Sequence, residues 1–241
     1  MALLQLKDVS YTYPDSPKPA LDNITFALET GQHVVLLGAN GSGKSTLARV
    51  AAGLLMPASG EVVMTGFEDQ AGWNGVGLLF QNPDEQLLTH SVEAELAWGL
   101  ENLGLLQDEM RRRIGEALEL FELSDKANSS PDTLSDGWKQ VTALASLAVM
   151  RPAFLILDEA TAFLDPYWTA KIKGMVRGLI EVSGLLWITA DGADAIKADR
   201  VLGLVDGQLI ADGNPREVLQ PERLEALGIE PVPDWVWNEE V

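Results

Sequence analysis

Short apolar runs rich in β-branched residues recur along the chain and alternate with segments of helical spacing. Five of these runs are VVLL at 34–37, VGLLF at 76–80, FLIL at 154–157, LLWIT at 185–189 and VLGLV at 201–205. Because strands that are buried on both faces are almost continuously apolar, the pattern predicts an α/β fold with a parallel sheet covered by helices on both sides. Two more predicted strands, at 3–9 and 24–28, flank a proline-rich turn at 14–19 and are expected to form a small antiparallel sheet.

The stretch from 82 to 134 has helical spacing and no strand pattern. Apolar residues share one helical face and then a second one, namely Val92, Leu96, Leu100 and Leu103, followed by Met110, Ile114, Leu118 and Phe121. This predicts a helical subdomain at 82–149 within a core formed by 1–81 and 150–225, followed by a C-terminal tail at 226–241. From residue 221 onward we predict a loop, which Trp235 and Trp237 would pin to the core.

Composition narrows the kinds of chemistry that are available. The chain has 241 residues, no cysteine and two histidines, so disulfides, iron–sulfur clusters and multi-histidine metal centres are excluded. Its net charge of −19 makes nucleic acid an unexpected partner, because phosphates would be repelled. No apolar run is long enough to span a bilayer and no signal peptide is recognisable, so we expect a protein of the cytosolic side.

The segment GANGSGKST fits the phosphate-binding loop pattern G-x-x-x-x-G-K-[ST]. Its residues are Gly38, Ala39, Asn40, Gly41, Ser42, Gly43, Lys44, Ser45 and Thr46. The loop follows the strand at 34–37 and opens a predicted helix, TLARVAAGLL, so its backbone N–H groups can face a phosphate at the positive helix end. We expect Lys44 to contact the β- and γ-phosphates of ATP and the Ser45 hydroxyl to bind Mg²⁺. The alternative is a glycine-rich turn that is followed by Lys-Ser by chance.

A second candidate element is FLILDEAT at 154–161. Its strand ends in two carboxylates, which places Asp158 and Glu159 at the carboxyl edge of the parallel sheet, where ligands bind. We expect Asp158 to hold Mg²⁺ and Glu159 to act on the attacking water as base or orienting group. On its own this pattern is weak, because many strands run into acidic loops, but with a phosphate loop it is specific.

A phosphate loop also occurs in small GTPases, kinases and motors, and a further motif separates these classes. The segment LSDGWKQVTALASLA at 134–148 precedes FLILDEAT and resembles the LSGGQ signature helix of the ABC ATPase family. The order of phosphate loop, Gln81, signature, FLILDE and LLWITAD is also the order in that family, over about residues 3–220. The resemblance implies an ABC ATPase fold with a parallel core sheet, a small antiparallel β subdomain and a helical subdomain.

Other ATPase classes do not match. No N-K-x-D motif for reading guanine is present, and the spacing leaves no room for the long coiled coil of chromosome-maintenance ATPases. The chain has one cassette, whereas translation-factor relatives usually have two.

The resemblance assigns further roles by matching positions. Tyr13 matches the aromatic residue that stacks on adenine, with a buried strand tyrosine as the alternative. Gln81 matches the glutamine that contacts Mg²⁺ and the attacking water, and so counts as both a metal-binding and a catalytic candidate. Ser135 and Gly137 of the signature would contact the γ-phosphate of an ATP that a second subunit holds. Together with Asp165, whose loop would cross to that subunit, this implies a dimer.

Two departures from the family pattern stand out. The signature has Asp136 and Trp138 where a glycine and the glutamine are expected, and Ala190 stands where a histidine would contact the γ-phosphate and the water. A carboxylate about 6 Å from a phosphate charge costs on the order of 3 kcal/mol at an effective dielectric of about 20. Asp136 either meets that cost or points away and caps its helix, where a carboxylate is favourable. We expect hydrolysis to be reduced.

The segment FQNPDEQLLTHSVEAELAWGLENLGL at 80–105 resembles the ATPases of energy-coupling-factor importers, which take up vitamins or transition-metal ions. This implies a peripheral subunit on the cytoplasmic face of the cell membrane, with a membrane-embedded scaffold and a small substrate-binding membrane subunit as partners. A generic ABC importer ATPase and a regulatory or structural ABC protein with little turnover remain as alternatives. We also expect Glu93, Glu95 and Glu101, on the helix that borders the interdomain groove, to dock arginines of the scaffold. The transported substrate and the choice between homo- and heterodimer are not encoded here.

Overall fold

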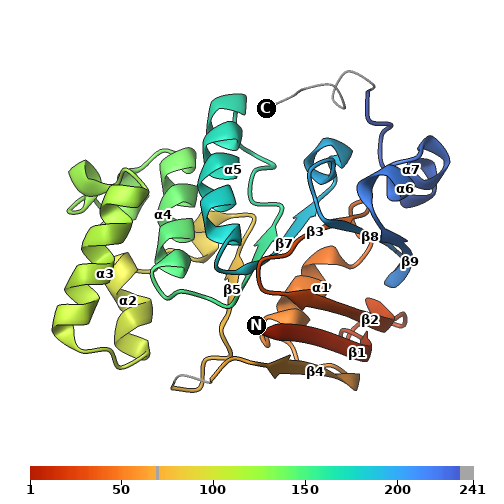
Figure 1. The fold of residues 1–241 in the computed structure, drawn as a ribbon, viewed down its shortest axis with the longest axis horizontal. Coiled ribbons are helices and arrows are strands. Elements are labelled where there is room, and N and C mark those ends of the chain that lie inside the picture. Colours follow the sequence, from red (N-terminus) through yellow and green to blue (C-terminus); the bar gives the residue numbers. More distant parts are fainter. Residues whose placement is uncertain (69–70, 234–241) are drawn as a thin grey trace.

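The computed structural model describes residues 1–68 and 71–233, and a six-stranded sheet lies at its centre (Figure 1). Its strands are β3 (His33–Leu37), β5 (Val76–Leu79), β6 (Phe154–Asp158), β7 (Gly184–Thr189), β8 (Arg200–Val205) and β9 (Gln208–Gly213). They pair in the order β5-β6-β7-β3-β8-β9, and β9 alone runs antiparallel to its neighbour. All five apolar runs of the sequence form the parallel part, as predicted.

A second, antiparallel sheet has the order β2-β1-β4. Its strands are β1 (Leu3–Tyr11), β2 (Leu21–Glu29) and β4 (Ser59–Thr65). The first two strands are those that the sequence predicts, but β4 and the edge strand β9 were missed. Both missed strands have mostly half-buried or exposed residues, so neither gives the continuous apolar run of a central strand.

Two hydrophobic cores lie on the opposite faces of the parallel sheet. Alternate residues of each strand point to opposite faces, so that Val34 and Leu36 of β3 enter one core while Val35 and Leu37 enter the other. The first core also contains the antiparallel sheet and α1 (Lys44–Ala51), and the second contains the remaining helices. The helix after the phosphate loop ends at Ala51, earlier than the predicted 46–55, because Gly53 turns with a φ of 78°.

Between β5 and β6 the chain forms only helices, which lie at one end of the molecule (Figure 1). They are η1 (Pro83–Glu85), α2 (Val92–Asn102), α3 (Gln107–Leu120), η2 (Ser124–Lys126), η3 (Pro131–Thr133) and α4 (Asp136–Ala148), where η denotes a short 3₁₀ turn. The predicted apolar faces do point inward, since Val92, Leu96 and Leu100 of α2 are fully buried. The Ser91 hydroxyl caps α2 by accepting a hydrogen bond from the Ala94 N–H.

The remaining elements follow β6, and one of them corrects a prediction. They are α5 (Pro166–Ile180), η4 (Gly192–Ala195), α6 (Pro215–Val218) and α7 (Pro221–Leu227). The predicted loop after residue 221 was wrong for α7, because Leu224 and Leu227 bury one face of this short helix in the second core. Trp235 and Trp237 lie outside the described residues. No helix in the described part of the chain is long and apolar enough to cross a membrane.

Candidate active site

The phosphate loop wraps around the Lys44 ammonium at the start of α1. Lys44 is almost completely buried, and its Nζ donates to the carbonyl oxygens of Gly38 and Ala39 at 2.8 and 3.0 Å. Gly43, with a φ of 109°, turns the chain into the helix, and a Cβ there would lie 2.5 Å from the Ala20 carbonyl oxygen. A Cβ at Gly41 would meet nothing within 4 Å, so this glycine leaves the backbone open toward the cavity. The loop is thus shaped to present a cation and backbone N–H groups to an anion.

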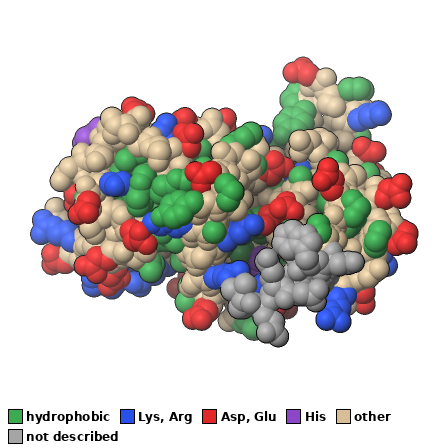
Figure 2. Space-filling model, turned by 90° about the horizontal axis from the view of Figure 1, so that it is seen from above, with side chains coloured by type: hydrophobic (Ala, Val, Ile, Leu, Met, Phe, Trp, Pro, Cys, Tyr) green, Lys and Arg blue, Asp and Glu red, His purple; other side chains and the backbone are tan. Residues whose placement is uncertain are grey.

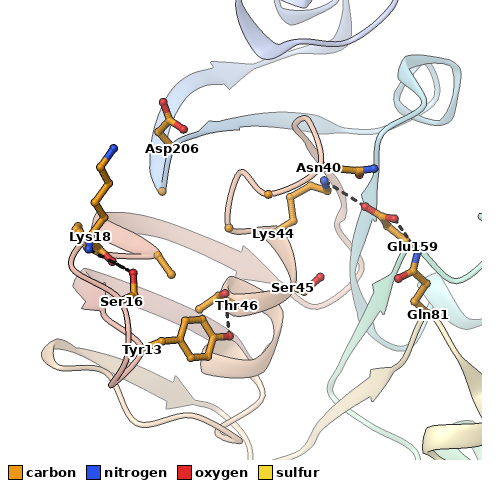
Figure 3. Close-up of a pocket in the computed structure, with 15 residues that line it drawn as sticks. Tyr13, Ser16, Lys18, Asn40, Lys44, Ser45, Thr46, Gln81, Glu159 and Asp206 are labelled. Atoms are coloured by element: carbon orange, nitrogen blue, oxygen red, sulfur yellow. Dashed lines mark hydrogen bonds and ion pairs between the residues drawn. The ribbon is translucent and has the colours of Figure 1, made fainter.

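The cavity over this loop has a volume of about 650 Å³ and lies between the two sheets' loops (Figure 3). Of the predicted residues, the cavity lining includes Tyr13, Asn40, Gly41, Gly43, Lys44, Ser45, Thr46, Gln81 and Glu159. Ser16, Lys18 and Asp206 also line it, and sequence reasoning missed them. The position of Ser16 and Lys18 in the 14–19 turn, directly after Tyr13, was the available signal.

Asp158 and Ser45 meet where β6 and α1 approach each other. The Ser45 hydroxyl donates to Asp158 Oδ1 at 3.1 Å, and Asp158 is 6% exposed. Burial raises the pKa of Asp158, and the Ser45 hydrogen bond opposes this shift only in part. A buried carboxylate and a hydroxyl form a hard oxygen pair of the kind that Mg²⁺ prefers.

Glu159 is held from two sides in front of the phosphate loop. One carboxylate oxygen lies 3.2 Å from Lys44 Nζ, and the other accepts a hydrogen bond from Gln81 Nε2 at 2.9 Å (Figure 3). Its backbone has a φ of 49°, which is uncommon for a residue with a side chain and recurs at functional sites. Three side chains predicted from the sequence are thus in direct contact in the fold: Lys44 at the start of α1, Gln81 after β5 and Glu159 after β6.

Tyr13 lies beyond the end of β1, half-buried at the cavity wall. Its hydroxyl is 3.2 Å from Thr46 Oγ1, and its ring meets the Tyr11 ring edge-on at a centroid distance of 5.0 Å. The alternative of a buried strand tyrosine is therefore wrong, since β1 ends at Tyr11. The ring is fixed on two sides while it still borders the cavity, as a platform for a flat base requires.

The signature residues sit apart from this cavity, at the start of α4. Ser135 is the N-cap residue and is exposed, while Asp136 is exposed in the first turn, where the helix dipole favours a carboxylate. Asp136 does not cap the helix with its side chain, so the capping alternative is not what the structure shows. Neither Ser135 nor Gly137 lines the phosphate-loop cavity of its own chain.

Trp168 of α5 covers Gly137, a contact that sequence reasoning missed. A Cβ on Gly137 would lie 2.1 Å from the Trp168 indole, so only glycine fits there. Trp138 packs against Trp168 with ring centroids 4.9 Å apart, and Lys126 and Lys171 lie over the Trp138 ring at 4.5 and 4.8 Å. We call these four side chains the tryptophan cluster. It joins the signature helix to α5 of the same chain, and the unusual Trp138 was its only sequence signal.

A cavity of about 400 Å³ lies beside Ala190, next to Glu159. The other walls come from Thr169 and Lys173 of α5 and from Asp191 and Asp194 around η4. Lys173 is paired with Asp194, which also accepts a hydrogen bond from Thr189 Oγ1 at 2.9 Å. The Ala190 methyl group therefore leaves space at the position where the family's histidine side chain would lie.

Comparison with known proteins agrees with this geometry. The sequence model described as ABC transporter matches residues 21–162. An energy-coupling factor transporter ATP-binding protein from Syntrophomonas wolfei is 40% identical over 95% of this chain and 88% of its own length. One from Symbiobacterium thermophilum is 41% identical over 92% and 83%, respectively.

Solved structures give the same assignment. A subunit of an ABC transporter complex from Clostridium perfringens, cbiO1, is 31% identical, has a TM-score of 0.78 and is covered over 92% of both chains. A dimeric ATP-binding cassette bound to ADP and phosphate is 27% identical, with a TM-score of 0.76 over 88% of this chain and 99% of the other. The chain therefore belongs to the ABC transporter family, among the ATP-binding subunits, and it binds and hydrolyses ATP.

Proposed function

We propose that the chain is the ATPase subunit of an energy-coupling-factor importer, working as a dimer on the cytoplasmic face of a membrane. The observation that carries this proposal is the similarity at about 40% identity, over nearly the whole chain, to relatives that bear this name. The vitamin or transition-metal ion that would be taken up is selected by a different, membrane-embedded subunit. ATP-driven closure of the dimer would then drive that subunit and its scaffold.

Each contact in the site supports a role for this chain's own residues. The phosphate-loop N–H groups and Lys44 would bind the β- and γ-phosphates, and Tyr13 would support the adenine. Glu159, held by Lys44 and Gln81, would orient the attacking water and accept its proton. When the phosphates bind, Lys44 would exchange its ion pair with Glu159 for one with them, because a phosphate group carries more negative charge than one carboxylate.

The residues present also fit a Mg²⁺ ion. Ser45 Oγ and the Asp158 carboxylate already lie together at 3.1 Å, and Gln81 lines the same cavity as Ser45. Within residues 1–68 and 71–233 no three His, Asp or Glu side chains form a metal cage. Mg²⁺ is commonly bound through one or two carboxylates together with substrate phosphates, a set that Asp158 and bound ATP would supply. The ion would neutralise charge that develops on those phosphates.

The surface for the membrane scaffold is proposed on α2 and the turn before it. Glu93 and Glu101 are exposed, and so are two large apolar side chains, Leu88 and Trp98, at 73% and 51%. Carboxylates around exposed apolar groups suit a helix that carries arginines. The prediction for Glu95 was wrong, because this residue is buried and its Oε2 accepts hydrogen bonds from the N–H groups of Leu88 and Thr89.

Co-purification with the scaffold from membranes tests the proposal. We expect the double variant Glu93→Lys/Glu101→Lys to lose the complex and to keep its affinity for ATP. The matched control is Asp108→Lys/Glu119→Lys, which makes the same charge change on exposed residues of α3 and should co-purify normally. Retention of the complex by the α2 variant would place the docking surface elsewhere.

A regulatory or structural ABC protein with little turnover is the second candidate. Ala190 and Asp136 favour it, because the first removes an imidazole next to Glu159 and the second adds a negative charge to the signature. If wild-type protein binds ATP but purifies with no membrane subunit and gains no activity from related ATPases, this second candidate is correct.

A further inference from the structure

A cavity of about 700 Å³ lies between α5, the first residues of β3 and β7, and the turn η4. It does not include any residue of the phosphate loop. Its walls are apolar in one part, from Val176 and Ile180 of α5, Leu185 and Trp187 of β7, and Ile196. None of the roles proposed above uses this cavity.

Positive charge surrounds the same cavity, in a chain where acidic residues outnumber basic ones by 36 to 17. Lys173, Arg177 and Lys197 line it. The two acidic lining residues are engaged locally, since Asp194 pairs with Lys173 and Asp199 Oδ2 accepts a hydrogen bond from the His33 N–H at 2.8 Å. Arg177 and Lys197 form no ion pair within residues 1–68 and 71–233. The cavity therefore suits a ligand that is both apolar and acidic.

His33 contributes a polar group to the lining of the cavity. Its Nε2 is buried and has no hydrogen-bond partner in the described part of the chain. Burial lowers the pKa of His33, so the ring is neutral and can accept a hydrogen bond. An indole N–H, which can only donate, is a suitable partner for such a nitrogen.

The described chain ends at the rim of this cavity. Val232 packs on Gly192, where a Cβ would lie 2.7 Å from the Val232 side chain, and the next two residues, Ala193 and Asp194, line the cavity. The eight residues that follow Pro233 have the sequence DWVWNEEV, with two tryptophans, two valines and three acidic residues. Fully extended, eight residues reach about 26–29 Å.

We propose that residues 234–241 dock into this cavity of the same chain, with Trp235 and Trp237 against its apolar walls and the acidic residues near Arg177 and Lys197. The three properties of the segment match those of the cavity: aromatic surface for the apolar walls, negative charge for Arg177 and Lys197, and an indole N–H for His33. A short tether raises the effective concentration to the millimolar range, so modest contacts suffice.

Thiol accessibility tests the proposal directly, because the chain contains no cysteine. In Ile180→Cys the new thiol lies in the cavity wall, and in the control Leu120→Cys it lies on the exposed end of α3. We expect maleimide to modify Ile180→Cys at least ~10-fold faster after Trp235→Ser/Trp237→Ser is added, because buried aromatic rings would no longer cover it. The rate for Leu120→Cys should not change with the tail substitution.

Charge reversal gives a second measurement that does not alter the tail. Arg177→Glu/Lys197→Glu in the Ile180→Cys chain should also raise the modification rate, most at low salt. Arg111→Glu/Arg216→Glu makes the same charge change on exposed residues away from the cavity and should leave the rate unchanged. Equal rates with and without the two tail tryptophans would overturn the proposal. Protection that grows with protein concentration would assign the cavity to a second copy, and would also overturn it.

The outcome of the thiol-accessibility experiment does not depend on the importer assignment. A chain that fails to bind a membrane scaffold can still show the tail-dependent protection, and a working importer subunit can lack it.

Discussion

Two regions of this chain that bear on ATP hydrolysis differ in how many residues of the family pattern they retain. At the phosphate-loop edge, Lys44, Ser45, Asp158 and Glu159 are all present and in contact with one another or with Gln81. At the signature and the loop after β7, Trp138, Asp136 and Ala190 replace expected residues. Figure 2 shows the molecule from above, where the densest group of hydrophobic side chains lies left of the centre with basic side chains next to it, and acidic side chains are spread over the whole face.

The difference separates two tasks. The intact edge would form the site where this chain binds its own ATP, and the altered signature would face the ATP of the other subunit. Ala190 lies beside Glu159, and we expect it to weaken turnover at the chain's own site, while Lys44 and the phosphate loop remain to bind the phosphates. Binding should therefore be normal, while turnover should depend on which subunit is the partner.

The largest expected effect comes from changing the partner. In a homodimer each ATP meets both Ala190 and the altered signature, whereas in a heterodimer with an unaltered ATPase each site has one of these defects. Since one positioned catalytic group contributes ~10²–10⁴ in rate, we expect the isolated chain to hydrolyse ATP slowly and a related ATPase subunit to raise the rate by a factor in that range. Steady-state phosphate release measures it, and rapid turnover by the purified chain alone would contradict the comparison.

The next largest effect is expected from Lys44→Ala. This change removes the buried ammonium that the carbonyls of Gly38 and Ala39 hold at the phosphate site. By analogy with the loss of one oxyanion donor, turnover in the active complex should fall ~10²–10³-fold. Calorimetric titration should show weaker ATP binding with an unchanged circular dichroism spectrum. Lys139→Ala, on α4 and paired with Asp84, is the control and should bind ATP normally.

Ala190→His should produce a smaller gain. The cavity of about 400 Å³ beside Glu159 has room for an imidazole, and the ring would lie next to the attacking water. We expect turnover to rise ~10-fold or more, because the imidazole would contact the attacking water and the γ-phosphate. Ala190→Asn offers similar size without a titratable ring and should give no comparable gain. An unchanged rate for Ala190→His would mean that the signature alone limits hydrolysis.

The smallest expected effect is on stability, at Asp158. Its pKa is raised in the folded chain by burial, so near neutral pH the charged form costs folding free energy. Asp158→Asn keeps the size of the side chain and its hydrogen-bonding capacity toward Ser45, and should stabilise the fold by about 1 kcal/mol. As pH falls through the raised pKa of Asp158 and then through the value in the unfolded chain, the Asp158 carboxyl of the wild type becomes neutral too. The difference in unfolding free energy between the two proteins should therefore disappear. A difference that is independent of pH between about 4 and 8 would contradict this account.

Much of the fold and the intact edge could be predicted because their signals are local. The phosphate loop is contiguous, and Glu159 follows an apolar strand, so chain order alone places both at one sheet edge. Glu95 shows where this fails. It was expected to dock arginines together with Glu93 and Glu101, yet its carboxylate accepts hydrogen bonds from two N–H groups of the preceding loop. Only the path of that loop decides this.

The predictions for the edge strands and for the end of the chain failed for related reasons. β4 and β9 bury only part of each residue, so their apolar signal is weak even though each strand pairs with a neighbour, β1 and β8 respectively. α7 has seven residues, too few for periodicity to stand out, and its formation depends on a hydrophobic core that distant strands supply.

The tryptophan cluster has a consequence for how this sequence can change. The Trp168 indole occupies the space where any Cβ on Gly137 would go. A residue larger than glycine at position 137 and a tryptophan at position 168 therefore cannot both be accommodated. A substitution at 137 is admissible only after 168 becomes small, and a small residue at 168 leaves Trp138 without its neighbour. Reverting the signature of this chain toward LSGGQ keeps Gly137 and changes only positions 136 and 138, and the change at 138 removes the ring that packs against Trp168.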